Sequence, residues 1–232
     1  MLDVRGLSRK FGDIAALDDV SFHVGSGEIV GLVGPNGSGK TTLLEVMCGL
    51  QPAAAGSVTW QGQPLPAERR KDVMFYIPDG ITPWPEHKTS DVLTFFARAF
   101  TQPHDVTDAV IEGLGLGPVL HKRVAALSKG YRRRLLIALG LIAPHPLLLM
   151  DEPFDGLDVR QTREVATLLR STAKGQRSLL LSIHQLVDAE RICDRLVLLS
   201  DGRVRGEGRI DELRCRAGLT AGGLEDVFLA LT

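Results

Sequence analysis

The first third of the chain alternates short apolar runs with turn residues, a pattern typical of β-strands. The spacing predicts strands over residues 2–7, 16–24, 29–33, 56–60 and 72–77. It predicts a helix over residues 40–48, and Gly49 ends this helix because glycine readily takes the conformation that closes a helical turn. We therefore expect mainly β-structure here, with one helix behind a glycine-rich turn.

The pattern changes in the middle of the chain. From Thr89 to about Gly140 apolar residues recur at helical spacing, which predicts a helical insertion. Afterwards we expect strands over residues 147–151, 178–183 and 196–199, helices over 159–170 and 185–193, and a turn into a further strand at 201–204. Two short helices should follow, up to Thr232. Because strands and helices alternate, the sheet is predicted to be mostly parallel and covered on both faces.

Composition narrows the classes of function. The chain has 232 residues, 44% of them hydrophobic, which is enough for one sizeable core and a small subdomain. A net charge of −1 and a pI near 6.6 exclude a field that would draw the whole chain to nucleic acid or an anionic membrane. Cys48, Cys193 and Cys215 include no CxxC pair and predict reduced cytosolic thiols. We expect neither a signal peptide nor a membrane-spanning segment.

The most specific motif is a glycine-rich loop between a predicted strand and a predicted helix. Residues 34–41 read Gly-Pro-Asn-Gly-Ser-Gly-Lys-Thr. Glycines let backbone amides approach phosphate oxygens closely, and the helix adds the partial positive charge of its N-terminus. In this context we expect Lys40 to reach the β- and γ-phosphates of a nucleotide and the Thr41 hydroxyl to ligate Mg²⁺.

Acidic residues follow the predicted strand at residues 147–151. Asp151 at the strand tip can hold Mg²⁺ through water, and Glu152 can orient or deprotonate an attacking water. Acidic residues are also common in ordinary loops, so the pair gains its weight from the glycine-rich loop. His184 follows the strand at 178–183 and would face the γ-phosphate if the strands lie side by side, although a lone histidine is more often structural.

Taken in order, these motifs resemble the nucleotide-binding subunit of ATP-binding cassette (ABC) proteins over nearly the whole chain. Residues 34–42 match the phosphate loop, 127–131 the signature sequence, 147–152 the Mg²⁺ strand with its catalytic glutamate, 156–158 the dimer-contact loop and His184 the switch histidine. The resemblance implies an α/β fold: a P-loop NTPase core with a mostly parallel sheet, an N-terminal antiparallel β portion and an inserted helical subdomain. We expect one domain, with residues 1–88 and 141–208 as the core, 89–140 as the helical insertion and 209–232 as C-terminal helices.

The resemblance also implies ATP and Mg²⁺ as cofactors. It implies catalytic roles for Lys40, Glu152 as general base, and His184, and metal ligation by Thr41, Asp79 and Asp151. Phe11 resembles the aromatic residue that stacks on adenine, although a lone phenylalanine after a strand is more often a core residue. The expected nucleotide contacts are Phe11, Gly34, Pro35, Asn36, Gly37, Ser38, Gly39, Lys40, Thr41, Thr42, Ser128, Lys129 and Gly130.

The segment at Ser128 and Gly130 reads locally as a helix start, with the serine as its cap. The resemblance implies in addition that two subunits pack head to tail and trap two ATP molecules. Each nucleotide would lie on the phosphate loop of one subunit and face the signature helix of the other, where a helix N-terminus attracts an anion. Because ADP lacks the γ-phosphate, hydrolysis should release this contact.

Two positions depart from the family pattern. The signature usually reads Leu-Ser-Gly-Gly-Gln, whereas Lys129 and Tyr131 occur here, in a form that resembles a subset of exporter ATPases. Lys129 either adds charge near the γ-phosphate or points to water. Asp79 stands where the family generally has glutamine, at the hinge between core and helical insertion. It either still engages Mg²⁺, directly or through water, or is a surface turn residue.

Three further features carry weaker signals. Arg132, Arg133 and Arg134 occupy successive helical positions and are expected on a solvated face, the alternative being contact with a partner subunit or with acidic loops. Residues 69–71 are expected in an exposed loop. Trp84 lies between two prolines and either forms a docking surface or packs on the helical insertion.

The functional hypothesis is an ATPase subunit that powers a separate membrane permease, for export. Its partners would be the permease and a second copy of itself or a related ATPase subunit. The subunit would be cytoplasmic and peripheral on the inner face of the cell membrane. We expect it neither to bind nucleic acid nor to insert directly into the membrane. Residues 224–229 resemble the end of single-cassette exporter subunits. The alternative, a soluble cassette ATPase acting on nucleic acid or ribosomes, usually has two cassettes or long insertions and a more basic surface. A regulator with little hydrolysis is disfavoured by Lys40, Asp151, Glu152 and His184.

Overall fold

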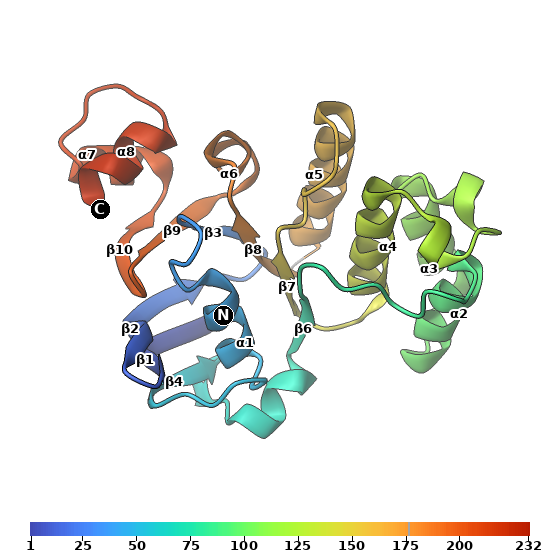
Figure 1. Cartoon of the computed structure of the whole chain (residues 1–232), viewed down its shortest axis with the longest axis horizontal. Helices are drawn as coiled ribbons and strands as arrows, with labels where there is room; N and C mark the ends of the chain where they lie inside the picture. The colour runs from blue at the N-terminus through green and yellow to red at the C-terminus, as the bar shows by residue number, and fades with distance from the viewer. Residues whose placement is uncertain (176) are drawn as a thin grey trace.

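The computed structural model describes residues 1–175 and 177–232, whose strands form two sheets (Figure 1). The antiparallel sheet has the order β2-β1-β4-β5, with β1 at Leu2–Phe11, β2 at Ile14–Val24, β4 at Ala55–Trp60 and β5 at Gln63–Pro64. The larger sheet has the order β10-β9-β3-β8-β7-β6. Its strands are β3 (Ile29–Val33), β6 (Met74–Ile77), β7 (Leu147–Asp151), β8 (Ser178–Ile183), β9 (Arg195–Ser200) and β10 (Arg203–Gly208).

The larger sheet is parallel except for β10, which pairs with β9 in the antiparallel sense. β3 lies between β8 and β9, and β7 lies between β8 and β6. The glycine-rich loop after β3, Asp151 at the end of β7 and His184 after β8 therefore leave the sheet at the same edge. This arrangement of strands confirms the predicted fold class.

The central strands of the larger sheet, β3, β7 and β8, are covered on both faces and are accordingly apolar along nearly their whole length. Alternate residues of β3 enter two different cores: Ile29 and Val33 pack with the helices α2 to α6, whereas Val30 and Leu32 pack with α1 and the antiparallel sheet. The helices are α1 (Lys40–Met47), α2 (Thr89–Ala99), α3 (His104–Gly113), α4 (Lys129–Ile142), α5 (Val159–Lys174), α6 (Leu186–Ile192), α7 (Ile210–Arg216) and α8 (Leu224–Leu231).

Most predicted elements occur within a few residues of their expected bounds. One difference is at β6, which starts only at Met74, because a 3₁₀ helix at Ala67–Asp72 ends on the first residue of the predicted strand. Within this 3₁₀ helix Arg70 is buried, so the prediction of an exposed loop is wrong for this residue. Its guanidinium donates to the carbonyl oxygens of Val46, at 2.7 Å, and Leu65, at 3.2 Å, which ties the end of α1 to this turn.

Helices α2, α3 and α4 lie together on one side of the molecule, away from the antiparallel sheet (Figure 1). α4 joins this group to the larger sheet by packing closely on β6. Gly140 allows this approach, because a Cβ atom at this position would lie only 2.4 Å from Ile77 Cδ1. Ser128 caps the N-terminus of α4 and accepts a hydrogen bond from the Tyr131 amide, as predicted. The division into core, insertion and C-terminal helices stays a prediction.

The C-terminal end of α4 is held by a partly buried cation, Arg177, which directly precedes β8. The Arg177 guanidinium donates to the carbonyl oxygens of Gly140 at 2.7 Å, Leu141 at 3.3 Å and His145 at 2.8 Å. Burial lowers the pKa of Arg177 to about 10.

Among the described residues no helix is long and apolar enough to cross a membrane. All three cysteines are free thiols.

Replacing Arg177 by methionine should destabilise the protein. The substitution leaves three carbonyl oxygens without their donor, and we expect the free energy of unfolding to fall by about 2 kcal/mol. Urea unfolding, monitored by circular dichroism, measures this change in the free energy of unfolding. Arg163→Met, at an exposed position of α5, is the matched control and should change stability by less than about 0.5 kcal/mol. Equal midpoints for the two variants would contradict the anchoring role.

Candidate functional site

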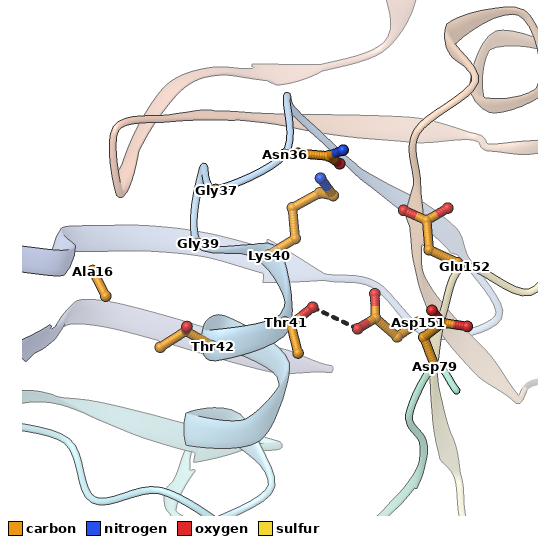
Figure 2. A pocket seen from close by; sticks show the side chains of 10 residues that line it. All are labelled: Ala16, Asn36, Gly37, Gly39, Lys40, Thr41, Thr42, Asp79, Asp151 and Glu152. Atoms are coloured by element: carbon orange, nitrogen blue, oxygen red, sulfur yellow. Dashed lines mark hydrogen bonds between the residues drawn. The ribbon is translucent and has the colours of Figure 1, made fainter. Parts of the chain in front are cut away.

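A polar cavity of about 320 Å³ lies at the edge where β3 and β7 end (Figure 2). The glycine-rich loop and the start of α1 form one side, and three carboxylates gather on the opposite side. The lining residues are Ala16, Asn36, Gly37, Gly39, Lys40, Thr41, Thr42, Asp79, Asp151 and Glu152. The structure thus brings together most of the residues that the motifs singled out.

The shape of the glycine-rich loop depends on positions without a side chain. A Cβ atom at Gly34 would lie 2.1 Å from the Leu199 carbonyl oxygen, and one at Gly39 would lie 2.6 Å from the Ala16 carbonyl oxygen. Gly39 also has a φ of 103°, which disfavours other residues. Around Gly37, by contrast, a Cβ would meet nothing within 4 Å, so this side of the loop is open to a ligand.

Lys40 is the cation of the cavity. Its ammonium group donates to the carbonyl oxygens of Gly34, at 2.8 Å, and Pro35, at 3.1 Å, so its charge is held by main-chain dipoles. Burial lowers the pKa of Lys40, and the carboxylates of Glu152 and Asp151 partly offset this by raising it. A buried ammonium beside a loop that is exposed at residues 35–37 is well suited to an anion with several oxygens.

Thr41 and Asp151 form a pair of oxygen ligands at the base of the cavity. The Thr41 hydroxyl donates to Asp151 Oδ2 at 2.6 Å, and the Asp151 side chain is buried at the end of β7. Among the described residues, no cluster of three or more His, Cys, Asp or Glu side chains could hold a metal ion. Mg²⁺ usually needs only one or two carboxylates beside the phosphates of its substrate, so a hydroxyl and a carboxylate fit it.

Glu152 and His184 are joined directly. Glu152 Oε2 accepts from His184 Nδ1 at 2.5 Å and from the His184 amide at 3.3 Å. The Glu152 amide in turn donates to the Ser182 carbonyl oxygen at 3.1 Å, which fixes the residue to the end of β8. Glu152 has a φ of 51°, in the left-handed region that few non-glycine residues adopt. The adjacent strands β7 and β8 bring these two side chains together, as their order in the sheet requires.

Other predicted residues lie apart from this cavity. Phe11, 45% exposed, stands at the β1–β2 turn with the Arg9 guanidinium 4.6 Å from its ring centre, and it does not line the cavity. Ser128 and Gly130, at the start of α4, do not line it either. Ala16 does line it and was missed, because a small apolar residue in a strand carries no chemical signal in the sequence.

Lys129 is largely exposed, yet its side chain has a partner within the same chain. Its role near a γ-phosphate stays a prediction. Its ammonium group pairs with Asp155, with an Nζ–Oδ2 distance of 2.7 Å, in the loop after β7. The Lys129 stem also packs on Gly156, where a Cβ atom would lie 2.7 Å from Lys129 Cγ. The pair lowers the pKa of Asp155, chiefly through the hydrogen bond from Lys129. Within one chain, Lys129 thus joins the start of α4 to the loop after β7.

Asp79 lines the cavity after the end of β6, and its Oδ1 accepts a hydrogen bond from Arg133 on α4. Arg133 itself is buried, so the prediction of a solvated face is wrong for this arginine, and the alternative, contact with acidic loops, is confirmed. Sequence reasoning could not find the pair because the two residues lie 54 positions apart. The metal role of Asp79 stays a prediction.

Comparison with known proteins places this geometry in a family. Residues 17–155 match the family model described as ABC transporter. The chain belongs to this family. A Nod factor export ATP-binding protein I from Rhizobium etli is 36% identical over 222 residues, which cover 91% of this chain and 70% of the relative. The corresponding protein from Ralstonia nicotianae is 35% identical over 219 residues, covering 92% and 68%.

A solved structure agrees with this assignment. The structure of an ATP-binding subunit of an ABC transporter matches with a TM-score of 0.90 and 30% identity, and the alignment covers 100% of this chain and 99% of that one. The chain is therefore an ATP-binding subunit of an ABC transporter, and as a member of this family it is an ATPase.

A pair of glycine variants tests the geometry of the loop. Gly39→Ala and Gly37→Ala both place alanine at a positive φ, of 103° and 81°, but only the first drives a methyl group into the Ala16 carbonyl oxygen. We expect Gly39→Ala to lower the free energy of unfolding by about 2 kcal/mol more than Gly37→Ala does. Thermal unfolding without nucleotide measures the difference. Equal losses would show that the close approach to β2 does not constrain the loop.

Proposed function

We propose that this ABC subunit binds Mg²⁺-ATP in the cavity beside the glycine-rich loop and hydrolyses it, with Glu152 as general base, to power a separate membrane permease that exports its substrate. The observation that carries the proposal is the meeting of two pairs at one sheet edge. Thr41 and Asp151 lie 2.6 Å apart in the cavity, and Glu152, which also lines it, is bonded to His184 at 2.5 Å.

Binding of the nucleotide rests on the loop and on Phe11. We assign the triphosphate to the amides of residues 34–42 and to Lys40, which can exchange its two carbonyl partners for phosphate oxygens. We assign the adenine to Phe11, whose ring is half exposed beside Arg9. Among the described residues, Thr41 and Asp151 would hold Mg²⁺, and Asp79, which lines the same cavity, would contribute directly or through water.

Glu152 and His184 would act on the attacking water. The Glu152 carboxylate can take a proton from water, and the Nδ1–H of His184 orients that carboxylate by donating to Oε2. Lys40, on the opposite side of the cavity, stabilises negative charge that grows on the transferred phosphoryl group. The metal ion, when bound, supplies further neutralisation of phosphate charge.

The signature residues point to a second subunit. Ser128 is exposed and Gly130 partly so, and neither lines the nucleotide cavity of its own chain. We propose that they face the γ-phosphate of ATP held by a second copy or a related ATPase subunit, in a head-to-tail dimer. The helix N-terminus of α4 would then contribute on the order of 0.3–1 kcal/mol to binding the anion. Lys129 would act indirectly, through its pair with Asp155.

A groove beside Asp79 offers a site for the permease. Trp84 packs edge-on against Phe95 and Phe96 of α2, with ring centres 5.2 and 5.9 Å apart, yet remains 44% exposed. The groove has a volume of about 280 Å³ and an almost wholly apolar lining of Phe75, Tyr76, Ile77, Ile81, Pro83, Trp84, Phe96, Leu136 and Leu139. Because the family works with membrane permeases, we assign it to a short permease helix.

The remaining assignments follow from the same proposal. Residues 1–88 and 141–208 would form the nucleotide-binding core, 89–140 the helical insertion and 209–232 the C-terminal helices. The subunit would sit in the cytoplasm, on the inner face of the membrane, held there by the permease. Export as the direction of transport is supported by the names of relatives such as the Nod factor export ATP-binding proteins.

Replacing Glu152 by glutamine tests the general base. Glutamine keeps the size of the side chain and removes its basicity, so we expect kcat to fall at least about 100-fold while ATP still binds. ATP should then stabilise a dimer, seen by size-exclusion chromatography with light scattering. Glu112→Gln, at an exposed position of α3, is the control and should retain activity. Turnover of Glu152→Gln within threefold of the parent would contradict the assignment.

A charge placed in the groove tests the permease site. Ile81→Asp puts a carboxylate into the apolar lining and should abolish saturable, trypsin-sensitive binding to membrane vesicles from the source cells. ATP turnover by the free subunit should stay within about twofold of the parent. Val106→Asp, at an exposed apolar position of α3, is the matched control and should bind as the parent does. Equal binding by both variants would remove the groove from the proposal.

A further inference from the structure

Arg133 is a buried charge in the first turns of α4. The side chain is only 6% exposed, whereas the neighbouring Arg132 and Arg134 are only partly buried. Arg134 reaches the Leu114 carbonyl oxygen and stacks on Tyr131. A guanidinium stays ionised at any physiological pH, so a buried one needs acceptors that compensate its charge.

Arg133 finds those acceptors in two loops of the larger sheet. It pairs with Asp79 after β6, and its Nη1 donates to the Asp151 carbonyl oxygen at 3.3 Å. Its Nη2 also lies 3.8 Å from Asp155 Oδ2, and Asp155 in turn pairs with Lys129. We call Asp79, Lys129, Arg133 and Asp155 the ion-pair cluster.

Asp79 is the member of the cluster that also faces the nucleotide cavity. It lines that cavity together with Thr41 and Asp151. It also lines a second cavity of about 330 Å³, whose lining is Asp79, Gly80, Ile81, Thr82, Lys129, Arg132, Arg133, Leu136 and Asp155. The Asp79 residue thus lines the cavity of the proposed metal position while its carboxylate pairs with the buried guanidinium.

We propose that Arg133 is a positioning residue that competes with Mg²⁺ for the Asp79 carboxylate, so that filling the metal site weakens the link between the loop after β6 and α4. This rests on the proposed function, because it takes the metal to lie at Thr41 and Asp151. A carboxylate drawn toward a divalent cation gives up close contact with the guanidinium. Arg133 then keeps only the Asp151 carbonyl oxygen and the more distant Asp155.

The competition predicts that substitution of Arg133 raises the affinity for Mg²⁺ rather than lowering it. Removing Arg133 should free Asp79 for the cation, and Mg²⁺ should then bind more tightly. Simple loss of a nearby positive charge would act in the same direction, so a matched control is needed. Arg132 provides it, because it lines the same second cavity one position earlier and has the same charge, while the contact with Asp79 belongs to Arg133.

The first experiment measures metal affinity without turnover. In a Glu152→Gln background with ATP, Mn²⁺ binding is followed by electron paramagnetic resonance and Mg²⁺ by competition. We expect Arg133→Gln to tighten metal binding about fivefold more than Arg132→Gln does, and we expect Asp79→Asn to remove this gain when combined with it. Equal affinities in Arg133→Gln and Arg132→Gln would overturn the proposal.

The second experiment uses the nucleotide-free protein, where the proposed function plays no part. Asp79→Asn, Arg133→Gln and the double variant form a double-mutant cycle in thermal unfolding. We expect the Tm losses of the two single variants to sum to clearly more than the loss in the double variant. Strictly additive losses would show that the pair carries no coupling, and would overturn the proposal whatever the metal does.

The two experiments distinguish failure of the role of Arg133 from failure of the proposed function. If the Glu152→Gln protein binds neither ATP nor Mn²⁺, the proposed function fails, and the competition fails with it even though the cycle can still show coupling. If ATP and Mn²⁺ bind normally but Arg133→Gln behaves like Arg132→Gln, the proposed function stands and only the role of Arg133 is refuted. A further experiment applies if Arg133→Gln does not fold. Trp60 is replaced by phenylalanine, so that the fluorescence reports Trp84, and Asp79→Asn is then expected to weaken the fluorescence change that Mg²⁺-ATP produces. An unchanged response refutes the proposal.

Discussion

The larger sheet is buried on both faces, and this constraint determines where polar chemistry can occur. Strands β3, β7 and β8 are apolar along nearly their whole length, so polar side chains can reach solvent only where the strands end. Because the three strands are parallel and adjacent through β8, the glycine-rich loop, Asp151 and His184 all emerge at one edge. The cavity forms at this edge because the polar groups of these strands can reach solvent only there.

The charges of the site balance one another across that edge. Lys40 and the start of α1 provide positive potential on one side, and Asp79, Asp151 and Glu152 provide negative potential on the other. Each carboxylate has a different partner: a threonine hydroxyl for Asp151, a histidine for Glu152 and an arginine for Asp79. Three chemically identical groups thus acquire three different environments from the elements packed around them.

Sequence reasoning succeeded where chemistry and spacing are local. Residues 34–41 specify their own loop, since the glycines, Lys40 and Thr41 are contiguous, and the run of apolar residues before Asp151 marks a buried strand. It failed for long side chains that cross between elements. Arg70 and Arg133 each sit in a polar run that looks solvated, and only the packing of α1 and α4 on the sheet shows that both are buried. No residue pattern within either run encodes its distant acceptors.

The left-handed backbone at Glu152 has a consequence for the evolution of this loop. A φ of 51° costs a non-glycine residue on the order of 1 kcal/mol, and glycine would relieve that cost. The chain nevertheless keeps a long acidic side chain there, bonded through its amide to β8 and through its carboxylate to His184. The residue that places a carboxylate at the cavity is thus also a point of stored strain, and selection for thermal stability alone would act against it.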